Sequence, residues 1–391
     1  MPIDVARARA ETPACADILH FNNAGASLMP VPVVDAIKGH IDLEARIGGY
    51  EAANREEAAG EHAYDAVARL LSCGRDEVAI VENATRAWDM AFYAVPLRAG
   101  DRILTARAEY VSNYLAFLQV TRRTGAVVEV VPSDASGQLD VEALRGMIDE
   151  RVKLIAVTHI PTNGGLINPV EAIGKIARAA GVLYLVDACQ SAGQMPLDVD
   201  RIGCDLLSAT GRKFLRGPRA TGFLYVRGSV LETLEPPFVD LHAATWTAAG
   251  DYTWRGDARR FENWETNYAT KIALGVAVDY ALGWGLEAVR DRTFALAAAL
   301  RQRLERIAGV RLRDLGRAKC GIVTFTVEGK DPLRIKADLL ARKINVTTSH
   351  LEFARLDMET RGLESMVRAS VHYYNTDGEI ERFAEAVETL A

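Results

Sequence analysis

Short apolar runs alternate with stretches of helical periodicity through the middle of this sequence, and that alternation narrows the possible folds more than any other feature. Helical patterns occupy, for example, residues 141–150 and 169–180. Strand and helix in alternation form a mostly parallel sheet whose two faces are covered by helices. We therefore predict an α/β fold with a seven-stranded, mostly parallel sheet. Its strands are expected at residues 78–81, 102–105, 127–131, 154–157, 183–186, 206–207 and 223–226.

The pattern changes near residue 268, where longer helices replace the alternation. Helices are expected at 271–283 and 286–306, followed by strands at 321–327 and 367–371. With 391 residues, of which 49% are hydrophobic, the chain can bury a large core in more than one domain. We expect an N-terminal segment 1–20 that joins the small domain, a large domain 21–267, and a smaller α+β C-terminal domain 268–391.

Composition and charge exclude several classes of partner. The net charge of −6 argues against nucleic acid or an anionic membrane as a principal partner, which leaves a small molecule. No apolar run approaches the roughly eighteen residues of a membrane span, and the first residues lack the apolar core of a signal peptide, so a cytoplasmic location is expected. The five cysteines are scattered and never form a C-x-x-C pair. Neither a disulfide framework nor a metal site is therefore indicated.

The stretch from 182 to 226 carries the clearest chemical signal. Asp187 closes one apolar run, and Lys213 follows a second one, beside Arg212. In sheets of this kind, ligands gather outside the carboxyl ends of the strands, where both residues fall. A buried carboxylate can keep a pyridine nitrogen protonated, and a lysine whose pKa is lowered by burial and nearby cations can bond an aldehyde as an imine. Pyridoxal 5′-phosphate (PLP) needs both groups from its protein.

Each of these residues has a plainer explanation when it is taken alone. An aspartate at a strand end is more often a turn former or a helix cap, and most lysines are solvated surface charges. The pairing of Asp187 with Lys213, each after its own apolar strand, favours the cofactor. Thr210 would add a hydroxyl for the phosphate, and Arg212 a charged donor. Other polar residues near expected strand ends are Asn83, Glu109 and His159.

A wider set of motifs resembles a known family. The resemblance runs from about residue 20 to the C-terminus, and the motifs occur in the family's order. They are 21–25 (Phe-Asn-Asn-Ala-Gly), His159, 187–190 (Asp-Ala-Cys-Gln), Arg212 with Lys213, Gly217 with Pro218, 367–370 (Val-Arg-Ala-Ser) and 374–376 (Tyr-Asn-Thr). The chain thus resembles the class V aminotransferase family of fold-type I PLP enzymes, which includes the cysteine desulfurases.

The resemblance implies a role for each matching residue around the cofactor. Lys213 would bond the PLP aldehyde and later move the substrate Cα proton, while Asp187 would pair with the pyridine nitrogen. Gln190 would donate to the phenolic oxygen, and Tyr110 would take the place of the family's ring-stacking histidine. The phosphate would be held by Ala84, Thr85, Thr210 and Arg212 and, from the neighbouring subunit of a homodimer with shared active sites, by Asn267.

The resemblance also implies where an amino-acid substrate would bind. Arg368 would grip the α-carboxylate, a bidentate task that suits arginine better than lysine. Thr162 or Asn163 would assist it. Asn23 and His350 are further candidate substrate contacts.

Two departures from the family bear on the reaction. Cysteine desulfurases carry a nucleophilic cysteine shortly before the Arg-Ala-Ser motif, but residues 347–366 contain no cysteine. Desulfuration through a persulfide is therefore not expected. Cys320 begins an apolar strand, where a thiol is usually a small buried hydrophobe. Tyr110 removes a titratable group from above the cofactor, although it still offers a ring and a hydroxyl.

Three segments are similar to one subgroup of the family. Residues 44–50, 217–219 and 346–348 resemble the hercynylcysteine sulfoxide lyases, which use PLP to cleave a C–S bond. Isopenicillin N epimerase, in the same broad group, moves a proton instead. Tyr50 and Arg219 would then be substrate contacts, although a helix stop and a surface charge explain these positions equally well.

All the candidate reactions begin with removal of the substrate Cα proton. A C–S β-lyase that acts on a cysteine conjugate or cysteine sulfoxide, giving pyruvate and ammonia, is the leading hypothesis. A racemase or epimerase is the second and an aminotransferase the third; an acid opposite Lys213 would favour racemisation, and Tyr50, Tyr110 and His350 are candidates for it. A protein that uses the fold only for binding is disfavoured, because it would not need both Lys213 and Arg368.

Overall fold

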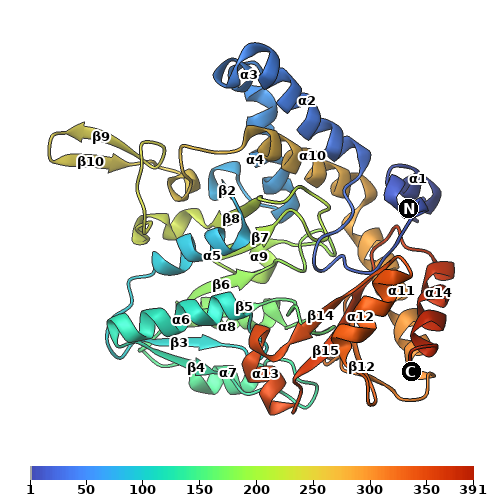
Figure 1. The fold of residues 1–391 in the computed structure, drawn as a ribbon. Coiled ribbons are helices and arrows are strands. Elements are labelled where there is room, and N and C mark those ends of the chain that lie inside the picture. The colour runs from blue at the N-terminus through green and yellow to red at the C-terminus, as the bar shows by residue number, and fades with distance from the viewer. Residues whose placement is uncertain (1) are drawn as a thin grey trace.

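A seven-stranded sheet forms the centre of the large domain in the computed structural model, which describes residues 2–391. The strand order is β2-β8-β7-β6-β5-β3-β4 (Figure 1). Neighbouring strands are parallel except at β8, which runs antiparallel to both β2 and β7. The predicted mostly parallel sheet is thus confirmed. Its strands are β2 (Val78–Val81), β3 (Arg102–Thr105), β4 (Val127–Val130), β5 (Val152–Thr158), β6 (Leu183–Asp187), β7 (Leu206–Thr210) and β8 (Gly222–Val226).

The reversal at β8 has a simple cause. A parallel connection needs a crossover of roughly a dozen or more residues, usually with a helix, and the segment 211–221 between β7 and β8 is shorter and contains no helix. The loop therefore turns back directly and carries Lys213 at the carboxyl end of β7. Gly222 begins β8, where a Cβ atom would lie 2.5 Å from the backbone of Asn83. Glycine thus lets β8 approach the start of helix α5 (Ala84–Tyr93).

Alternating side chains of the sheet supply two cores, one on each face. Tyr184 and Val186 of β6 pack on one face with α4, α8 and α10, whereas Leu185 packs on the other face with α5 and α6. This period-two pattern is that of a strand buried on both sides. The covering helices are α4 (Glu57–Leu71), α6 (Val111–Thr124), α7 (Val141–Met147), α8 (Val170–Ala180), α9 (Val199–Ile202) and α10 (Tyr268–Trp284).

The smaller domain is an antiparallel four-stranded sheet with the order β11-β12-β15-β14. Phe325, Val367 and Phe383 are fully buried in its core. Strand β1 (Leu19–His20) pairs in parallel with β13 (Ile344–Asn345), which ties the start of the chain to this domain. The other elements are α11 (Leu286–Glu305), β11 (Val310–Leu312), β12 (Ile322–Val327), α12 (Pro332–Ala341), β14 (Thr347–His350), α13 (Arg355–Thr360), β15 (Ser365–Ser370) and α14 (Asp377–Glu388).

Two parts of the chain extend from the body of the large domain. A hairpin of β9 (Ala244–Ala248) and β10 (Asp251–Trp254) reaches outward (Figure 1), and its Trp246 is 79% exposed. Helices α2 (Val31–Ile47) and α3 (Gly49–Arg55) lie together at another edge, where α2 packs on α10. The remaining short elements are α1 (Val5–Ala10) and the 3₁₀ turns Pro13–Ala16, Arg75–Glu77, Gly228–Thr233, Ala258–Phe261 and Leu351–Phe353.

A helix that spans a membrane must be both long and apolar. No single helix within residues 2–391 has both the length and the apolar character to cross a membrane. Helices α10 and α11 are long and apolar enough only as a pair, and the two helices are bent by 78° relative to each other. Leu274 of α10 and Leu300 of α11 are fully buried in the cores of the two domains.

The predicted elements agree with the structure in place and type, and differ at their ends. The strand predicted at 206–207 extends to Thr210, because its polar end also pairs with β8. The helix predicted to begin at residue 271 begins at Tyr268. Asn267 caps it, since its side-chain Oδ1 accepts the N–H of Thr270 at 2.9 Å.

Candidate active site

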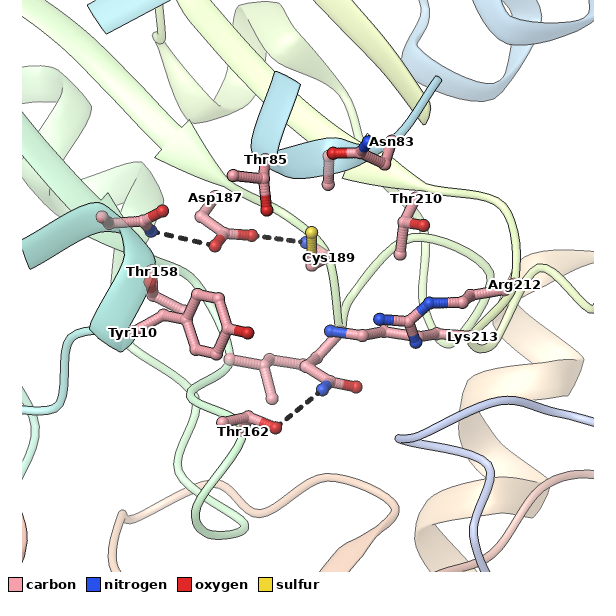
Figure 2. A pocket seen from close by; sticks show the side chains of 14 residues that line it. Asn83, Thr85, Tyr110, Thr158, Thr162, Asp187, Cys189, Thr210, Arg212 and Lys213 are labelled. Carbon is pink, nitrogen blue, oxygen red and sulfur yellow. Dashed lines mark hydrogen bonds between the residues drawn. The ribbon is translucent and has the colours of Figure 1, made fainter. Parts of the chain in front are cut away.

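A cavity of about 240 Å³ lies where the carboxyl ends of β5, β6 and β7 meet the first turn of α5. Figure 2 shows the fourteen side chains that line it. Among them are nine residues to which the sequence assigned a role: Ala84, Thr85, Tyr110, Thr162, Asp187, Gln190, Thr210, Arg212 and Lys213. Parallel strands bring these positions together because their carboxyl ends share one edge of the sheet.

Asp187 is the last residue of β6 and is held in one orientation. Its Oδ1 accepts the backbone N–H of Cys189 at 2.8 Å, and its Oδ2 accepts the side-chain amide of Asn113 at 3.0 Å (Figure 2). Only 5% of its surface is exposed. A buried carboxylate fixed in this way can pair with a cationic ring nitrogen, as predicted from its place in the sequence.

Lys213 extends into the same cavity from the loop after β7 (Figure 2). Its amine has no hydrogen-bond partner among residues 2–391. Burial lowers the pKa of Lys213, and the nearby charges of Arg212 and Arg368 lower it further, against the opposing effect of Asp187. A lysine with a lowered pKa has more of the neutral amine, which is the form that bonds an aldehyde and accepts a proton.

Arg368 lies in β15 of the small domain and points its guanidinium at the large domain. Its Nη1 donates to the carbonyl oxygen of Thr162 at 3.1 Å and also to the Thr162 hydroxyl, while its buried Nε has no partner. Burial lowers the pKa of Arg368 to about 10, so the side chain stays cationic at neutral pH. A buried guanidinium with an unused N–H is suited to bind a carboxylate.

The phosphate end of the predicted site lies at the start of α5. The N–H groups of Ala84 and Thr85, in the first helical turn, have no intrahelical partner, and both residues line the cavity. The positive end of the helix dipole there favours an anion. Thr210 and Arg212 lie on the other side (Figure 2). The Thr210 hydroxyl donates to the Thr221 carbonyl oxygen at 3.1 Å, and Nη1 of Arg212 donates to the Gly25 carbonyl oxygen. The two backbone N–H groups and the remaining N–H groups of Arg212 are therefore the donors that fit a phosphate.

The hydrogen bonds of Gln190 are only partly compatible with donation to the phenolic oxygen of PLP. Its Nε2 already donates to the carbonyl oxygen of Ala24 and to the hydroxyl of Thr162, both at 3.1 Å, whereas its buried Oε1 has no partner. Both N–H groups are thus engaged. Donation to the phenolic oxygen of a cofactor would require Gln190 to exchange its bond to Thr162 for that oxygen.

Tyr110 stands at the N-terminal cap of α6, and its ring lines the cavity with the hydroxyl pointing toward Lys213 (Figure 2). The tyrosine can therefore cover one face of a flat ligand. Its backbone N–H donates to Glu109 at 2.8 Å, which fixes where the ring emerges.

Asn23 is engaged by the fold, so its contact with a substrate stays a prediction. The sequence suggested a substrate contact, but the fold uses the whole amide of Asn23. Its Nδ2 donates to the carbonyl oxygen of Ser370 at 2.7 Å, and its Oδ1 accepts the hydroxyl of Tyr374. Asn23 therefore ties the N-terminal segment to the end of β15.

Tyr50 does not line the Lys213 cavity of its own chain, so its contact with a substrate stays a prediction. Tyr50 is 74% exposed and lines a second cleft of about 690 Å³, together with Trp264 and Asn267. Asn267 was expected to act on a neighbouring subunit, so its place outside the cavity of its own chain is compatible with that prediction.

Three further candidates lie outside the cavity lining. Asn163 accepts the hydroxyl of Ser349 at 3.2 Å, and its amide group approaches the Met358 sulfur. His350 lies 2.9 Å from the hydroxyl of Thr348 through its Nε2. Arg219 is exposed. Burial lowers the pKa of Arg212 and the charge of Arg219 lowers it further, so the two arginines are near neighbours.

Sequence reasoning missed several residues that line the cavity. Cys189 lies within the 187–190 motif, and its thiol faces the cavity (Figure 2); burial raises its pKa, so the thiol stays protonated. Asn83, which the sequence placed near a strand end without giving it a role, also lines the cavity. Thr158 and Ile160 follow the predicted strand 154–157, which is the signal that could have identified them. Asn113 gave no such signal, because it lies in the first turn of a helix and not at the end of a strand.

The residues present fit PLP. A lysine amine without a hydrogen-bond partner within residues 2–391, a fixed carboxylate and a phosphate cradle at a helix N-terminus surround one cavity. PLP would be held by Lys213, Asp187 and the Ala84–Thr85–Thr210–Arg212 cradle, where it would supply an electron sink for a carbanion at the substrate Cα.

Comparisons with known proteins agree with this fit. The Aminotransferase class-V family model matches residues 19–383. A probable cysteine desulfurase of Xylella fastidiosa strain 9a5c is 32% identical over 381 residues, covering 95% of this chain and 90% of the relative. The apo structure of a cysteine desulfurase from Thermococcus onnurineus NA1 superposes with a TM-score of 0.93 at 28% identity, covering 100% of this chain and 98% of that one.

A third similarity shows the fold alone. The cystine C–S lyase C-DES, solved in complex with its product cysteine persulfide, has a TM-score of 0.86 at 23% identity and covers 96% of this chain and 99% of that one. The match of the family model, together with the geometry around Lys213 and Asp187, leads to one conclusion: the chain belongs to the class V aminotransferase family of fold-type I PLP enzymes, and PLP is its cofactor.

Proposed function

We propose that this enzyme is a C–S β-lyase that acts on a cysteine conjugate or cysteine sulfoxide. Two parts of the site differ in the chemistry that they offer, and this difference supports the proposal. The cavity keeps the lysine, acid and arginine needed to remove a Cα proton, whereas the small-domain segment 347–366 offers no thiol to accept sulfur. Glu352, Arg355 and Leu356 of that segment, together with Leu115 of α6, line a small groove between the domains.

Each residue then has a defined task. Arg368 and Thr162 bind the substrate α-carboxylate, which fixes the amino acid relative to Lys213. The neutral Lys213 amine takes the Cα proton, and the sulfur substituent leaves from Cβ with the electron pair of the C–S bond. The leaving thiolate or sulfenate takes up a proton. The unsaturated amino acid that remains reacts with one water to give pyruvate and ammonia.

The only thiol lining the cavity within residues 2–391 is Cys189, and its environment suits packing better than sulfur transfer. Burial raises its pKa, and the adjacent carboxylate of Asp187 opposes ionisation further. A thiol is nucleophilic as the thiolate, so Cys189 is poorly activated. The relatives named as cysteine desulfurases belong to the same family as this chain. The reaction that we propose differs from desulfuration because it ends with release of the sulfur compound.

The experiment offers the purified enzyme L-cystine, an S-alkyl-L-cysteine, its sulfoxide, and L-cysteine in parallel. A C–S β-lyase releases pyruvate and ammonia in equal amounts from one of the conjugates, and Lys213→Ala releases neither. Alanine formed from L-cysteine would instead indicate desulfuration and would contradict the proposal. Cys189→Ala separates the two reactions further, because it should preserve the release of pyruvate.

A racemase is the second candidate, and one observation favours it. Tyr110 enters the cavity from the side across from Lys213, with its hydroxyl directed toward the lysine (Figure 2), so a second proton donor can face the substrate position from the opposite side. Solvent deuterium that enters Cα with loss of optical activity, and without pyruvate, would identify this reaction. Tyr110→Phe would then stop the loss of optical activity.

We also propose that the enzyme is a homodimer in which Asn267 completes the partner's phosphate site. The support is the second cleft, where the exposed rings of Tyr50 and Trp264 flank Asn267. Exposed aromatic side chains are enriched in protein interfaces. A monomeric mass in solution would contradict this proposal, whereas a dimer whose PLP affinity falls in Asn267→Ala would support it.

A further inference from the structure

A second buried carboxylate lies behind Asp187, and the reaction as described above does not use it. Glu109 is only 3% exposed, in the loop between β3 and α6. It accepts the backbone N–H groups of Tyr110 at 2.8 Å and Thr158 at 3.1 Å, and the hydroxyl of Thr105 at 3.2 Å. The Thr158 hydroxyl also donates to it. Five donors, counting the amide of Asn113, therefore converge on this carboxylate.

Asn113 joins the two carboxylates directly. Its amide nitrogen donates to Glu109 Oε1 at 2.9 Å and to Asp187 Oδ2 at 3.0 Å, which uses both of its N–H groups. Asn113 is 2% exposed and lies in the first turn of α6, one helical turn beyond Glu109. One rigid amide thus sets the distance and orientation of Asp187 relative to Glu109.

The two carboxylates have no ion-pair partner within residues 2–391: neither Glu109 nor Asp187 forms an ion pair of 4.0 Å or less. Lys213 is the one cation in the same part of the chain whose pKa the Asp187 charge is seen to raise, and its amine is the group that bonds the cofactor aldehyde in the site described above. Burial raises the pKa of Glu109 to about 7, and the charge of Asp187 contributes to the rise. Two buried acids without a cation are costly unless a cation arrives with a ligand. A protonated pyridine ring beside Asp187 is such a cation.

We propose that Asn113 and Glu109 are positioning residues for the cofactor acid: Asn113 fixes the orientation of the Asp187 carboxylate, and Glu109 strengthens the negative field that keeps the cofactor ring nitrogen protonated. Neither residue touches the reacting atoms. The inference rests on the PLP cofactor and not on the proposed lyase reaction, so either can fail without the other.

A purely structural role makes a different prediction. Glu109 also holds the start of α6 and the end of β5 through its bonds to Tyr110 and Thr158. If Glu109 served only to hold these two segments, substitution of Glu109 or Asn113 would weaken the binding of PLP and of any ligand with the same shape to the same extent. The proposal requires a loss that depends on the ring nitrogen. A PLP analogue in which carbon replaces that nitrogen therefore distinguishes the two roles.

The test measures binding to Asn113→Ala and to its matched control, Asn168→Ala. Asn168 is equally buried, at 2% exposed, and also makes two hydrogen bonds, to Leu139 and Thr158, but it does not contact Asp187. Both variants are made in the Lys213→Ala protein, where no covalent bond masks the contribution of the ring. PLP and the carbon analogue are titrated into each protein, and thermal unfolding confirms that each is folded.

We expect Asn113→Ala to weaken PLP binding about tenfold to a hundredfold, which is typical for loss of a bond to a charged group or of an outer partner of a ligating residue. Binding of the carbon analogue should change less than about threefold. Asn168→Ala should leave the ratio of the two affinities at the Lys213→Ala value. Equal weakening of both ligands, or an unchanged ratio in Asn113→Ala, would overturn the proposal.

Glu109→Gln tests the charge separately, and Asn113→Ser replaces Asn113→Ala if the alanine variant does not fold. Serine has one hydroxyl proton and cannot bridge two carboxylates. Each variant should lower the preference for PLP over the carbon analogue. A preference that survives in every folded variant would mean that Glu109 and Asn113 serve only the fold.

Discussion

The large domain and its border with the small domain contain two clusters of cationic side chains, and the clusters differ in whether the chain supplies the opposite charge. In the paired cluster, Arg259 donates to both oxygens of Glu61, at 3.0 and 2.7 Å. Lys271 there donates to the hydroxyl of Tyr64 at 2.9 Å, and that hydroxyl donates to Glu262 at 2.8 Å. The open cluster, made of Arg212, Lys213 and Arg368, has no carboxylate at ion-pairing distance within residues 2–391.

The difference shows which property marks a ligand site. Burial lowers the pKa of Lys271 as well as that of Lys213, so a shifted pKa does not separate the two lysines. Hydrogen bonding does separate them: Lys271 donates to the Tyr64 hydroxyl, which donates to Glu262, whereas the Lys213 amine has no hydrogen-bond partner within residues 2–391. Buried charges are normally satisfied within the protein. We therefore expect a cluster without ion pairs to be completed by a ligand, and the cofactor phosphate and the substrate carboxylate are the ligands that we propose.

The largest expected effect follows from removing the amine of the open cluster. Lys213→Ala should abolish turnover and the visible absorbance of covalently bound cofactor, because no other amine among residues 2–391 lines the cavity. Lys271→Met, at the paired cluster, should retain the absorbance. A spectrum of each purified protein checks both outcomes, and persistence of the band in Lys213→Ala would show that the open cluster has been misassigned.

Arg368→Ala should weaken substrate binding by about 2–5 kcal/mol, the range for removing one partner of a buried charge pair. Its guanidinium is buried and has an unused N–H, so a bound carboxylate loses its main partner. Substrate titration of the variant measures the loss. Arg368→Lys should recover only part of it, since an ammonium cannot reproduce the bidentate contact. Unchanged binding in Arg368→Ala would disprove the carboxylate assignment.

Glu262→Gln should lower the free energy of unfolding by about 1–3 kcal/mol without changing cofactor affinity. Glu262 accepts the N–H of Ile80 at 2.6 Å as well as the hydroxyl of Tyr64, and it lies 3.0 Å from His242. Urea denaturation and a PLP titration measure the two quantities. A fall in cofactor affinity with no loss of stability would reverse the roles that we give to the two clusters.

The pH dependence of the free energy of unfolding should reveal the raised pKa of Glu109, which has no ion-pair partner within residues 2–391. The folded-state pKa of Glu109, about 7, lies above its ordinary value of 4.5. Between these values the folded protein binds the proton more tightly than the unfolded chain, so the free energy of unfolding falls as pH rises. The slope contributed by Glu109 approaches about 1.4 kcal/mol per pH unit in the cofactor-free protein. Glu109→Gln should remove this contribution, and an identical slope in both proteins would contradict it.

Much of the fold and of the cofactor site could be predicted from short windows of sequence. Periodicity located the strands of the large sheet, because apolar runs buried on both faces are continuous in the chain. Asp187 and Lys213 were identifiable since each stands at the end of such a run. Their common place at one edge then followed from parallel strand order.

Contacts between distant segments could not be predicted in the same way. The amide of Asn23 is used by Ser370 and Tyr374, which lie more than three hundred positions away in the chain. Tyr50 lines a cleft with Trp264 rather than the Lys213 cavity, because α3 lies at another edge of the domain. Residue type gave no sign of either outcome.

The sequence by itself determined the fold class and the cofactor and pointed to the acid and amine expected to hold it, because these depend on local periodicity and on motifs. The tertiary structure alone decided which charges are paired. It placed Glu61 against Arg259, left Arg368 without a carboxylate, and set Asn113 between Asp187 and Glu109. Charge pairing depends on distances of a few ångströms between segments far apart in the chain, and only the folded packing fixes those distances.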